Sequence, residues 1–170
     1  MEVDGTRSPR YATAVAVRLP RRAYLAIGEV LTHPRFHPIH RRLYRWAGGR
    51  GPLSRALGVD MILVTGRGRR TGASRTVPLA AVPDGRAWIV VGSNAGKPET
   101  PGWVHNLRAH PHVRVEHRAR SATYVASEPH PGDAGRLWDS LTAAYPGFAV
   151  YRSRASRQIP LFILEPLGED

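Results

Sequence analysis

The chain has 170 residues, 42% of them hydrophobic, so it can bury one sizeable core, and we expect one structural domain overall. It contains no cysteine, which excludes disulfides, thiol nucleophiles and cysteine-ligated metals and fits a reducing cytoplasm. The formal net charge of +12 predicts an anionic partner: nucleic acid, an anionic membrane surface or an acidic ligand.

The basic residues are almost all arginine, Lys97 being the exception. This bias fits a GC-rich coding genome, but arginine is also the residue that binds phosphate and carboxylate in bidentate fashion. No apolar run approaches the roughly 20 residues of a membrane helix, and the start lacks the apolar core of a signal peptide. We therefore expect a cytoplasmic protein.

Residues 1–60 form a basic N-terminal arm with amphipathic helices. Apolar residues recur at helical spacing over 21–32, and a second such helix is predicted over 36–46. One interpretation is that the arm lies on the inner membrane face or over a substrate mouth. The alternative is that its helices cover the core and turn a solvated face outward.

Residues 61–170 form the second region, in which the hydrophobic period changes to that of strands. Short β-type runs at 61–65, 75–82 and 87–92 predict an antiparallel meander. Thr100 is expected to cap a helix over 102–109, with Pro101 at its first position.

Further along, 113–117 and 120–127 read as a hairpin, 131–145 as a helix, and 159–165 as a last strand. Strands outnumber helices and hairpins dominate. The pattern predicts a mainly β fold with flanking helices, namely a small antiparallel barrel with helices packed outside.

The turn between the first two strands reads GRGRRTG. Glycines such as Gly66 let the backbone bend and expose N–H groups toward an anion, and Arg69, Arg70, Thr71 and Arg75 add charge and a hydroxyl. The stretch matches neither GxxxxGK[ST] nor GxGxxG. A solvated hairpin edge is the alternative interpretation.

A second loop, SNAGKP at 93–98, leaves a strand and leads toward Trp103. Small hydrogen-bonding side chains followed by an aromatic residue suit a flat heteroaromatic ring. On the predicted helix Trp103 shares a face with Asn106. The alternative is an ordinary loop with Trp103 in the core.

Three aromatic residues, Tyr145, Phe148 and Tyr151, lie three apart in YPGFAVY. If this segment is helical, they line one wall of a pocket, where a phenol donates a proton to a carbonyl or orients it. Core packing is the alternative. The histidines do not group at ligand spacing, so no metal site is predicted, and the absence of GxSxG excludes a hydrolase elbow.

Three stretches together resemble the deazaflavin-dependent nitroreductase family, also described as quinone reductases that use reduced coenzyme F-420. They are LVTGRGRRTGASRTVPL, VVGSNAGKPETPGWVHNLRAHPHVRV and LWDSLTAAYPGFAVYRSRASRQIPLFILEP, and the resemblance covers 61–166. It implies a split β-barrel related to the flavin-binding oxidoreductase barrels. It also implies hydride transfer from the reduced deazaflavin to a quinone-like, nitro or other conjugated acceptor.

The resemblance also implies roles for individual residues. Those holding the cofactor's phosphate and acidic tail would be Arg69, Arg70, Thr71 and Arg75, with Pro78 shaping the adjoining strand. Those around the ring would be Ser93, Asn94, Gly96 and Trp103. Those facing the substrate would be Tyr145 and Tyr151, and protonation would come from Tyr145, Tyr151, Ser93 or water.

Two positions depart from the family pattern. Phe148 stands where the best-known members have tyrosine, which bears on activity toward bicyclic nitroimidazoles, and Asn94 stands where a lysine is familiar. Two other functions stay open: an FMN-binding barrel of the same shape, and a basic, non-enzymatic module for nucleic acid or an anionic surface. The sequence leaves monomer or homodimer open.

Overall fold

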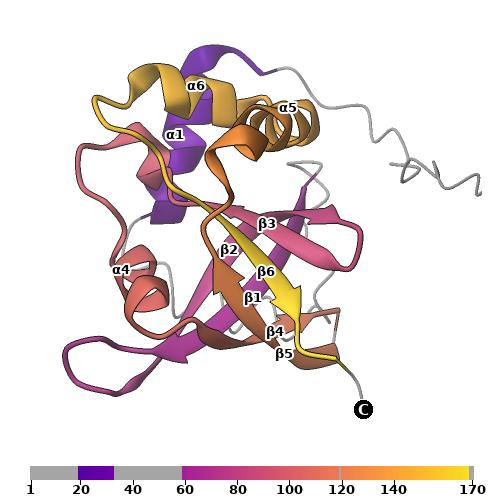
Figure 1. Cartoon of the computed structure of the whole chain (residues 1–170). Coiled ribbons are helices and arrows are strands. Elements are labelled where there is room, and N and C mark those ends of the chain that lie inside the picture. Colours follow the sequence, from indigo (N-terminus) through magenta and orange to yellow (C-terminus); the bar gives the residue numbers. More distant parts are fainter. Residues whose placement is uncertain (1–18, 33–58, 119, 169–170) are drawn as a thin grey trace, which may run out of the picture.

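Six antiparallel strands form a closed barrel in the order β1-β2-β3-β6-β5-β4, with β4 pairing back onto β1 (Figure 1). The computed structural model describes residues 19–32, 59–118 and 120–168. The strands are β1 (Asp60–Arg67), β2 (Ser74–Asp84), β3 (Ala87–Val91), β4 (His112–His117), β5 (Arg120–Ser127) and β6 (Leu161–Pro166). The predicted mainly β barrel with helices outside is confirmed.

Three helices cover one end of the barrel, and a fourth lies at its side (Figure 1). They are α1 (Arg21–Thr32), α5 (Ala134–Ala144) and α6 (Gly147–Arg154) above the strands, and α4 (Gly102–Ala109) beside β1. Two single-turn 3-10 helices complete the described part, η1 (Asn94–Gly96) and η2 (Pro131–Asp133). The helix predicted over 21–32 is confirmed, whereas that predicted over 36–46 lies outside the described residues.

The core has two parts, because successive side chains of a strand point to opposite faces. In β3, Val90 points into the barrel, where it meets Phe162 and the α4 residue Val104. Its neighbours Ile89 and Val91 belong instead to the core under α1, α5 and α6. The run AWIVV is therefore apolar without alternation because both faces of the strand are buried.

Several predicted boundaries are wrong by a few residues. Helix α4 takes Pro101 as its N-cap, so Thr100 does not cap it. The helix predicted from residue 131 begins as the 3-10 turn η2 and becomes α-helical only at Ala134. Gly66 lies inside β1, paired with Arg75, rather than in the turn. The ends of these elements are set by strand pairing and side-chain packing, so local sequence propensity predicts them only to within a few residues.

Within the described ranges, no helix is both long and apolar enough to cross a membrane.

Candidate functional site

A cavity of about 640 Å³ opens between the helical end of the barrel and the start of α4. Its walls come from α1, β2, the loop after β3 and α6. Among the lining residues are Gly28, Thr32, Arg75, Val77, Pro78, Leu79, Ser93, Asn94, Lys97, Glu99, Trp103, Asn106, Tyr145, Phe148 and Tyr151. The volume is that of a typical site for a small molecule or cofactor.

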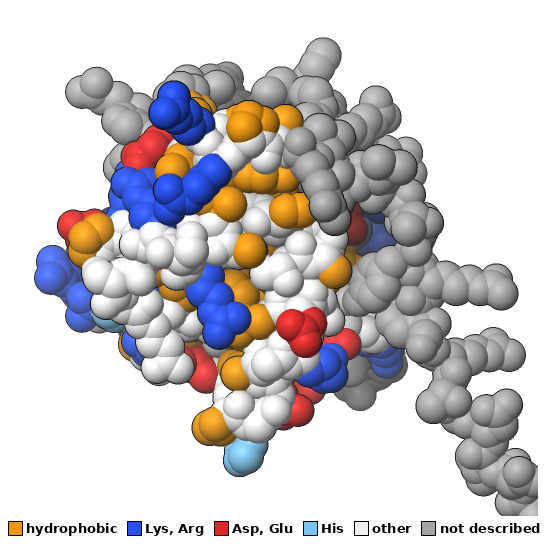
Figure 2. Space-filling model, turned by 90° about the horizontal axis from the view of Figure 1, so that it is seen from above, with side chains coloured by type: hydrophobic (Ala, Val, Ile, Leu, Met, Phe, Trp, Pro, Cys, Tyr) orange, Lys and Arg blue, Asp and Glu red, His pale blue; other side chains and the backbone are white. Residues whose placement is uncertain are grey.

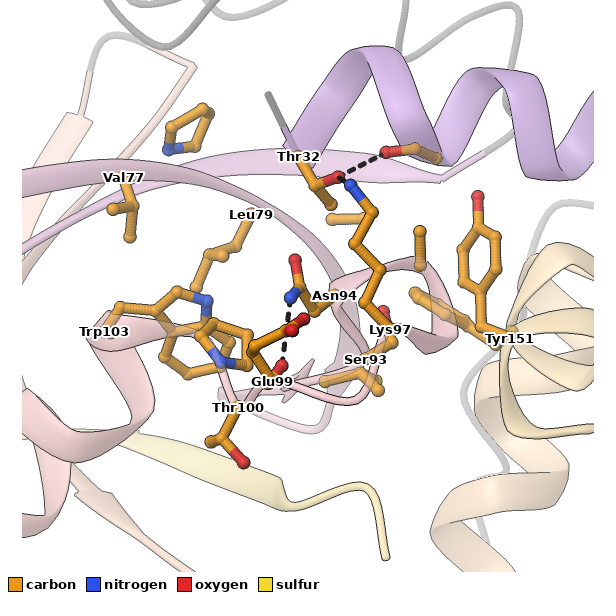
Figure 3. A pocket seen from close by; sticks show the side chains of 18 of the residues that line it. Thr32, Val77, Leu79, Ser93, Asn94, Lys97, Glu99, Thr100, Trp103 and Tyr151 are labelled. Carbon is orange, nitrogen blue, oxygen red and sulfur yellow. Dashed lines mark hydrogen bonds between the residues drawn. The ribbon is translucent and has the colours of Figure 1, made fainter. Parts of the chain in front are cut away.

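One side of the cavity is built for a flat ligand. In Figure 3, Trp103, Val77 and Leu79 lie together on one side, with Ser93 and Asn94 from the loop after β3 beside them. Trp103 is half-buried and its ring lies 6.0 Å from that of Phe162, so the core fixes it from one side while the other side borders the cavity.

Ser93 is buried, and its hydroxyl has no hydrogen-bond partner among the described residues. The residue is only 8% exposed, and its side chain makes no hydrogen bond within the part of the chain that the structure describes. Buried polar groups nearly always have a partner, and an orphan in a cavity wall is explained by a ligand or a water molecule. Ser93 therefore marks a position where a bound molecule accepts or donates a hydrogen bond.

The opposite wall is aromatic. Tyr145, Phe148 and Tyr151 are buried, and their ring centroids lie 5.2 to 6.4 Å apart. Tyr145 ends α5, and α6 brings the other two onto the same wall, as the spacing predicts for a helical segment. Gly147 is required there, since a Cβ at this position would overlap the Tyr145 ring.

The two phenols are hydrogen-bonded. Tyr151 donates to the backbone carbonyl of Tyr24 at 2.9 Å, and its oxygen lies 3.2 Å from the hydroxyl oxygen of Tyr145. Since a carbonyl only accepts, the single Tyr151 proton is engaged and Tyr145 is the donor between the two phenols. Burial raises the pKa of both tyrosines, so both stay protonated at neutral pH.

The arginine-glycine turn between β1 and β2 is exposed and protrudes from the barrel (Figure 1). The Asn106 side-chain oxygen accepts from the backbone N–H of Arg69 at 3.1 Å, and this ties the turn to the α4 face that also carries Trp103. The guanidinium groups of Arg69, Arg70 and Arg75 make no ion pair among the described residues. The positive charge of these three guanidinium groups is therefore available to bind an anionic ligand.

Helix α1 is joined to the cavity wall by charged groups. Glu29 pairs with Lys97 at 2.6 Å and with Arg154 at 2.9 Å, and hydrogen bonds to Lys97 lower the pKa of this carboxyl. Lys97 also donates to the Thr32 hydroxyl at 3.4 Å (Figure 3). Seen from above the helical end, Lys and Arg side chains cluster on part of the face beside exposed apolar ones (Figure 2).

Eight of the residues singled out from the sequence line the cavity together: Arg75, Pro78, Ser93, Asn94, Trp103, Tyr145, Phe148 and Tyr151. The others do not: Gly66, Arg69, Arg70, Thr71 and Gly96. Gly66 is a strand residue, and Gly96 faces α6, where a Cβ would lie 2.6 Å from the Tyr151 carbonyl oxygen. The Thr71 hydroxyl accepts from the Ala73 N–H at 3.3 Å within the turn.

The sequence alone did not indicate three features of the site. Gly28 and Thr32 bring α1 into the cavity wall, and Asn106 is hydrogen-bonded to the turn between β1 and β2. Arg157 does not line the cavity but is hydrogen-bonded to the loop after β3. A signal existed for Asn106, which shares the Trp103 face, and for Gly28, because a glycine inside a helix usually has a packing reason. None existed for Arg157, one of many arginines.

The closed barrel holds a mostly apolar cavity that carries a few hydrogen-bonding groups, which is the form of a small-molecule or cofactor site. The family model for F420H(2)-dependent quinone reductase matches residues 37–166, and the chain belongs to that family. The resemblance seen in the sequence is thus confirmed, together with the class of enzyme and the deazaflavin as its cofactor.

Individual relatives agree with this assignment. An F420H(2)-dependent quinone reductase of Mycobacterium tuberculosis is 33% identical over 129 residues, 74% of this chain and 87% of the relative. A solved F420-H2 dependent reductase is 32% identical with a TM-score of 0.58, covering 62% of this chain and 93% of that one. A solved domain-swapped dimer is 28% identical with a TM-score of 0.59, covering 75% and 98%.

Proposed function

We propose that this cavity is the site at which reduced coenzyme F-420 and a quinone-like, nitro or other conjugated acceptor meet. The cofactor, when bound, supplies the hydride, and the chain binds, orients and shields the reactants from water. The observation that carries the proposal is the buried Ser93 hydroxyl, which has no partner in the described part of the chain and lies in a cavity that Trp103 and Arg75 also line.

The anionic end of the cofactor fits the arginine side of the cavity. Arg75 lines it, and Arg69 and Arg70 lie on the turn that Asn106 fastens nearby. Because these guanidinium groups have no carboxylate partner among the described residues, binding an anion breaks no existing ion pair. Hydrogen bonds between arginine and phosphate are charge-assisted and thus stronger than neutral ones.

The ring fits between the Trp103 side and the loop after β3. Ser93 offers its free hydroxyl to the polar edge of the ring. The Asn94 amide nitrogen donates to the Glu99 carbonyl at 2.9 Å, which leaves its side-chain oxygen as an acceptor. We assign Gly96 a backbone role, because it lets η1 lie against α6, and Pro78 a place in the wall of β2.

The acceptor fits the aromatic wall. Reduction of a quinone to its hydroquinone requires the hydride, which carries both electrons, and one proton. The Tyr145 proton is donated to Tyr151 and the Tyr151 proton to Tyr24, whereas the Ser93 proton has no acceptor among the residues that the structure describes. We therefore assign Ser93 or a water molecule as the direct proton donor. Tyr145 and Tyr151 would orient the acceptor, and Tyr145 would become a donor on rotation of its hydroxyl.

We place this reaction in the cytoplasm, with the basic arm of residues 1–60 at the inner membrane face. The arginine content of the arm supports this placement, since anionic lipids attract basic segments. Flotation with anionic and neutral vesicles tests it. Binding to anionic vesicles that salt removes supports the placement, and an absence of binding at low salt contradicts it.

The function is tested by titrating the purified protein with the oxidised deazaflavin and, separately, with FMN. Turnover is then followed by the absorbance of the reduced deazaflavin with quinones, enones and nitro compounds as acceptors. We expect deazaflavin to bind, FMN to bind more weakly, and Ser93→Ala to reduce turnover. Tight FMN binding without deazaflavin binding would overturn the proposal.

A further inference from the structure

We propose that Arg157 is a positioning residue that holds the loop between β3 and α4 in the shape that builds the cofactor wall. The role of the loop as a cofactor wall depends on the function proposed above. The contacts that hold it do not, because they lie within the protein itself.

The Arg157 guanidinium donates hydrogen bonds to several backbone carbonyls of this loop. One terminal nitrogen, Nη2, donates to the carbonyl oxygens of Gly92 at 3.0 Å, Ser93 at 3.1 Å and Glu99 at 3.3 Å. Its Nε donates to the carbonyl of Lys97 at 3.2 Å. The two ends of the loop, Gly92 and Glu99, are thus held by a single nitrogen.

The loop that it holds has an unfavourable backbone. Three successive residues have left-handed φ angles, Asn94 at 48°, Ala95 at 54° and Gly96 at 77°. Only glycine adopts this region freely, and asparagine tolerates it better than alanine. Such a conformation persists only where the surrounding structure fixes it.

Strand pairing provides only part of that constraint: β3 ends at Val91, and beyond it the Gly92 N–H donates to the Pro160 carbonyl at 2.8 Å, while η1 packs against α1 and α6. The Asn94 carbonyl accepts from the Lys97 N–H at 3.0 Å within the loop. Most of the other loop carbonyls accept from the C-terminal segment, that of Ala95 from the Arg154 guanidinium at 3.4 Å and the rest of the bonded ones from Arg157. With the carbonyls directed this way, Ser93 and Asn94 present their side chains to the cavity (Figure 3). Arg157 does not line the cavity, so it acts on a ligand only through the loop.

A lysine cannot replace this arginine. The planar guanidinium donates in several fixed directions at once, whereas an ammonium group is a compact point donor on a flexible stem. Arg157→Lys therefore keeps the charge and loses the simultaneous contacts with Gly92, Lys97 and Glu99. This separates positioning from simple electrostatic attraction of an anionic cofactor.

The test uses Arg157→Lys and Arg157→Ala in the full chain, with Arg152→Ala as the matched control. Arg152 is exposed, and its guanidinium lies 4.8 Å from the centroid of the Trp138 ring, away from the loop. Amide hydrogen exchange of residues 92–99 is measured without ligand. Deazaflavin affinity is measured by fluorescence, and kcat and KM with a quinone acceptor.

We expect faster exchange confined to 92–99 in both Arg157 variants and at least tenfold weaker deazaflavin binding. The acceptor KM should change less, and millimolar guanidinium ion should restore part of the affinity in Arg157→Ala. The Arg152→Ala control should match wild type in all readouts. Unchanged exchange and affinity in both Arg157 variants would overturn the proposal, and so would faster exchange spread over the whole barrel.

If instead the proposed function is wrong, the same experiments give a different result. In that case wild-type protein does not bind deazaflavin, while exchange in the ligand-free variants still shows whether Arg157 holds the loop.

Discussion

The hydroxyl oxygen of Tyr145 lies 3.2 Å from that of Tyr151, and Tyr151 in turn donates to the carbonyl of Tyr24 in α1. The aromatic wall of the cavity is thereby hydrogen-bonded to α1. Because the proton of each phenol is directed along this chain of hydrogen bonds, we expect the two tyrosines to orient an acceptor rather than to donate a proton directly.

Replacing the two tyrosines should have unequal effects. Tyr151→Phe removes both hydrogen bonds and leaves Tyr145 without its acceptor, so we expect a loss of about 1–3 kcal/mol in unfolding free energy. Tyr145→Phe leaves the bond to Tyr24 intact and should cost less stability, while it slows acceptor reduction with little effect on cofactor binding. Denaturant unfolding and steady-state kinetics of both variants measure this, and equal destabilisation would contradict it.

Stability at high pH should depend on these phenols. Burial raises the pKa of Tyr145 above its ordinary value of 10.0. A folded-state pKa above the unfolded one gives stability that is complete below pH 10 or so and is lost as the pH rises toward the folded value. Unfolding free energy should thus fall more steeply from pH 9 to 11 in wild type than in Tyr145→Phe. Parallel curves would show that Tyr145 ionises normally.

Removal of Arg75 should weaken cofactor binding more than removal of Arg70. Both side chains are exposed, but only Arg75 lines the cavity, so solvent between Arg70 and a ligand in the cavity screens the Arg70 charge more. We expect an increase in Kd of roughly tenfold to a hundredfold for Arg75→Ala, and a smaller, salt-sensitive one for Arg70→Ala. The control is Arg86→Ala, an exposed arginine in the turn between β2 and β3. If all three variants bind alike, the tail site is elsewhere.

We propose that Phe148 limits the range of acceptors. It is 4% exposed, lines the cavity and meets the Tyr145 ring edge-on at 5.2 Å. Phe148→Tyr adds a hydroxyl to this wall and should broaden acceptance to bicyclic nitroimidazoles. Phe148→Leu, which adds no hydroxyl, should not. Reduction rates with a nitroimidazole and a quinone decide this, and no gain in Phe148→Tyr would mean that this departure does not limit the activity.

Gly28 lets α1 approach the cavity wall. A Cβ there would lie 2.7 Å from that of Ala95 and 2.8 Å from the Tyr151 hydroxyl oxygen. Gly28→Ala should therefore destabilise by about 1–3 kcal/mol through overpacking, despite the higher helix propensity of alanine. Gly135→Ala in α5 meets nothing within 4 Å and should stabilise by about 0.4–1 kcal/mol. Thermal unfolding measures both, and stabilisation by Gly28→Ala would contradict the packing account.

Much of the barrel follows from local pattern. The period-two runs, the hairpin turns and the helix at 21–32 were predicted because such signals act between neighbours in sequence. The loop at 93–98 and the YPGFAVY spacing likewise placed Ser93, Asn94 and Tyr151 on the cavity. Boundaries at Thr100 and Gly66 failed because packing and register, not propensity, decide them.

The sequence by itself determined the family, the elements and the residues that carry polar chemistry. Only the tertiary structure decided which of them meet. Closure of β4 onto β1 and the position of β6 between β3 and β5 are non-local pairings. The bond from Tyr151 to Tyr24 spans 127 residues, and that from Arg157 to Gly92 spans 65. The spacing of residues within a short segment does not predict such contacts, because they depend on the path of the whole chain.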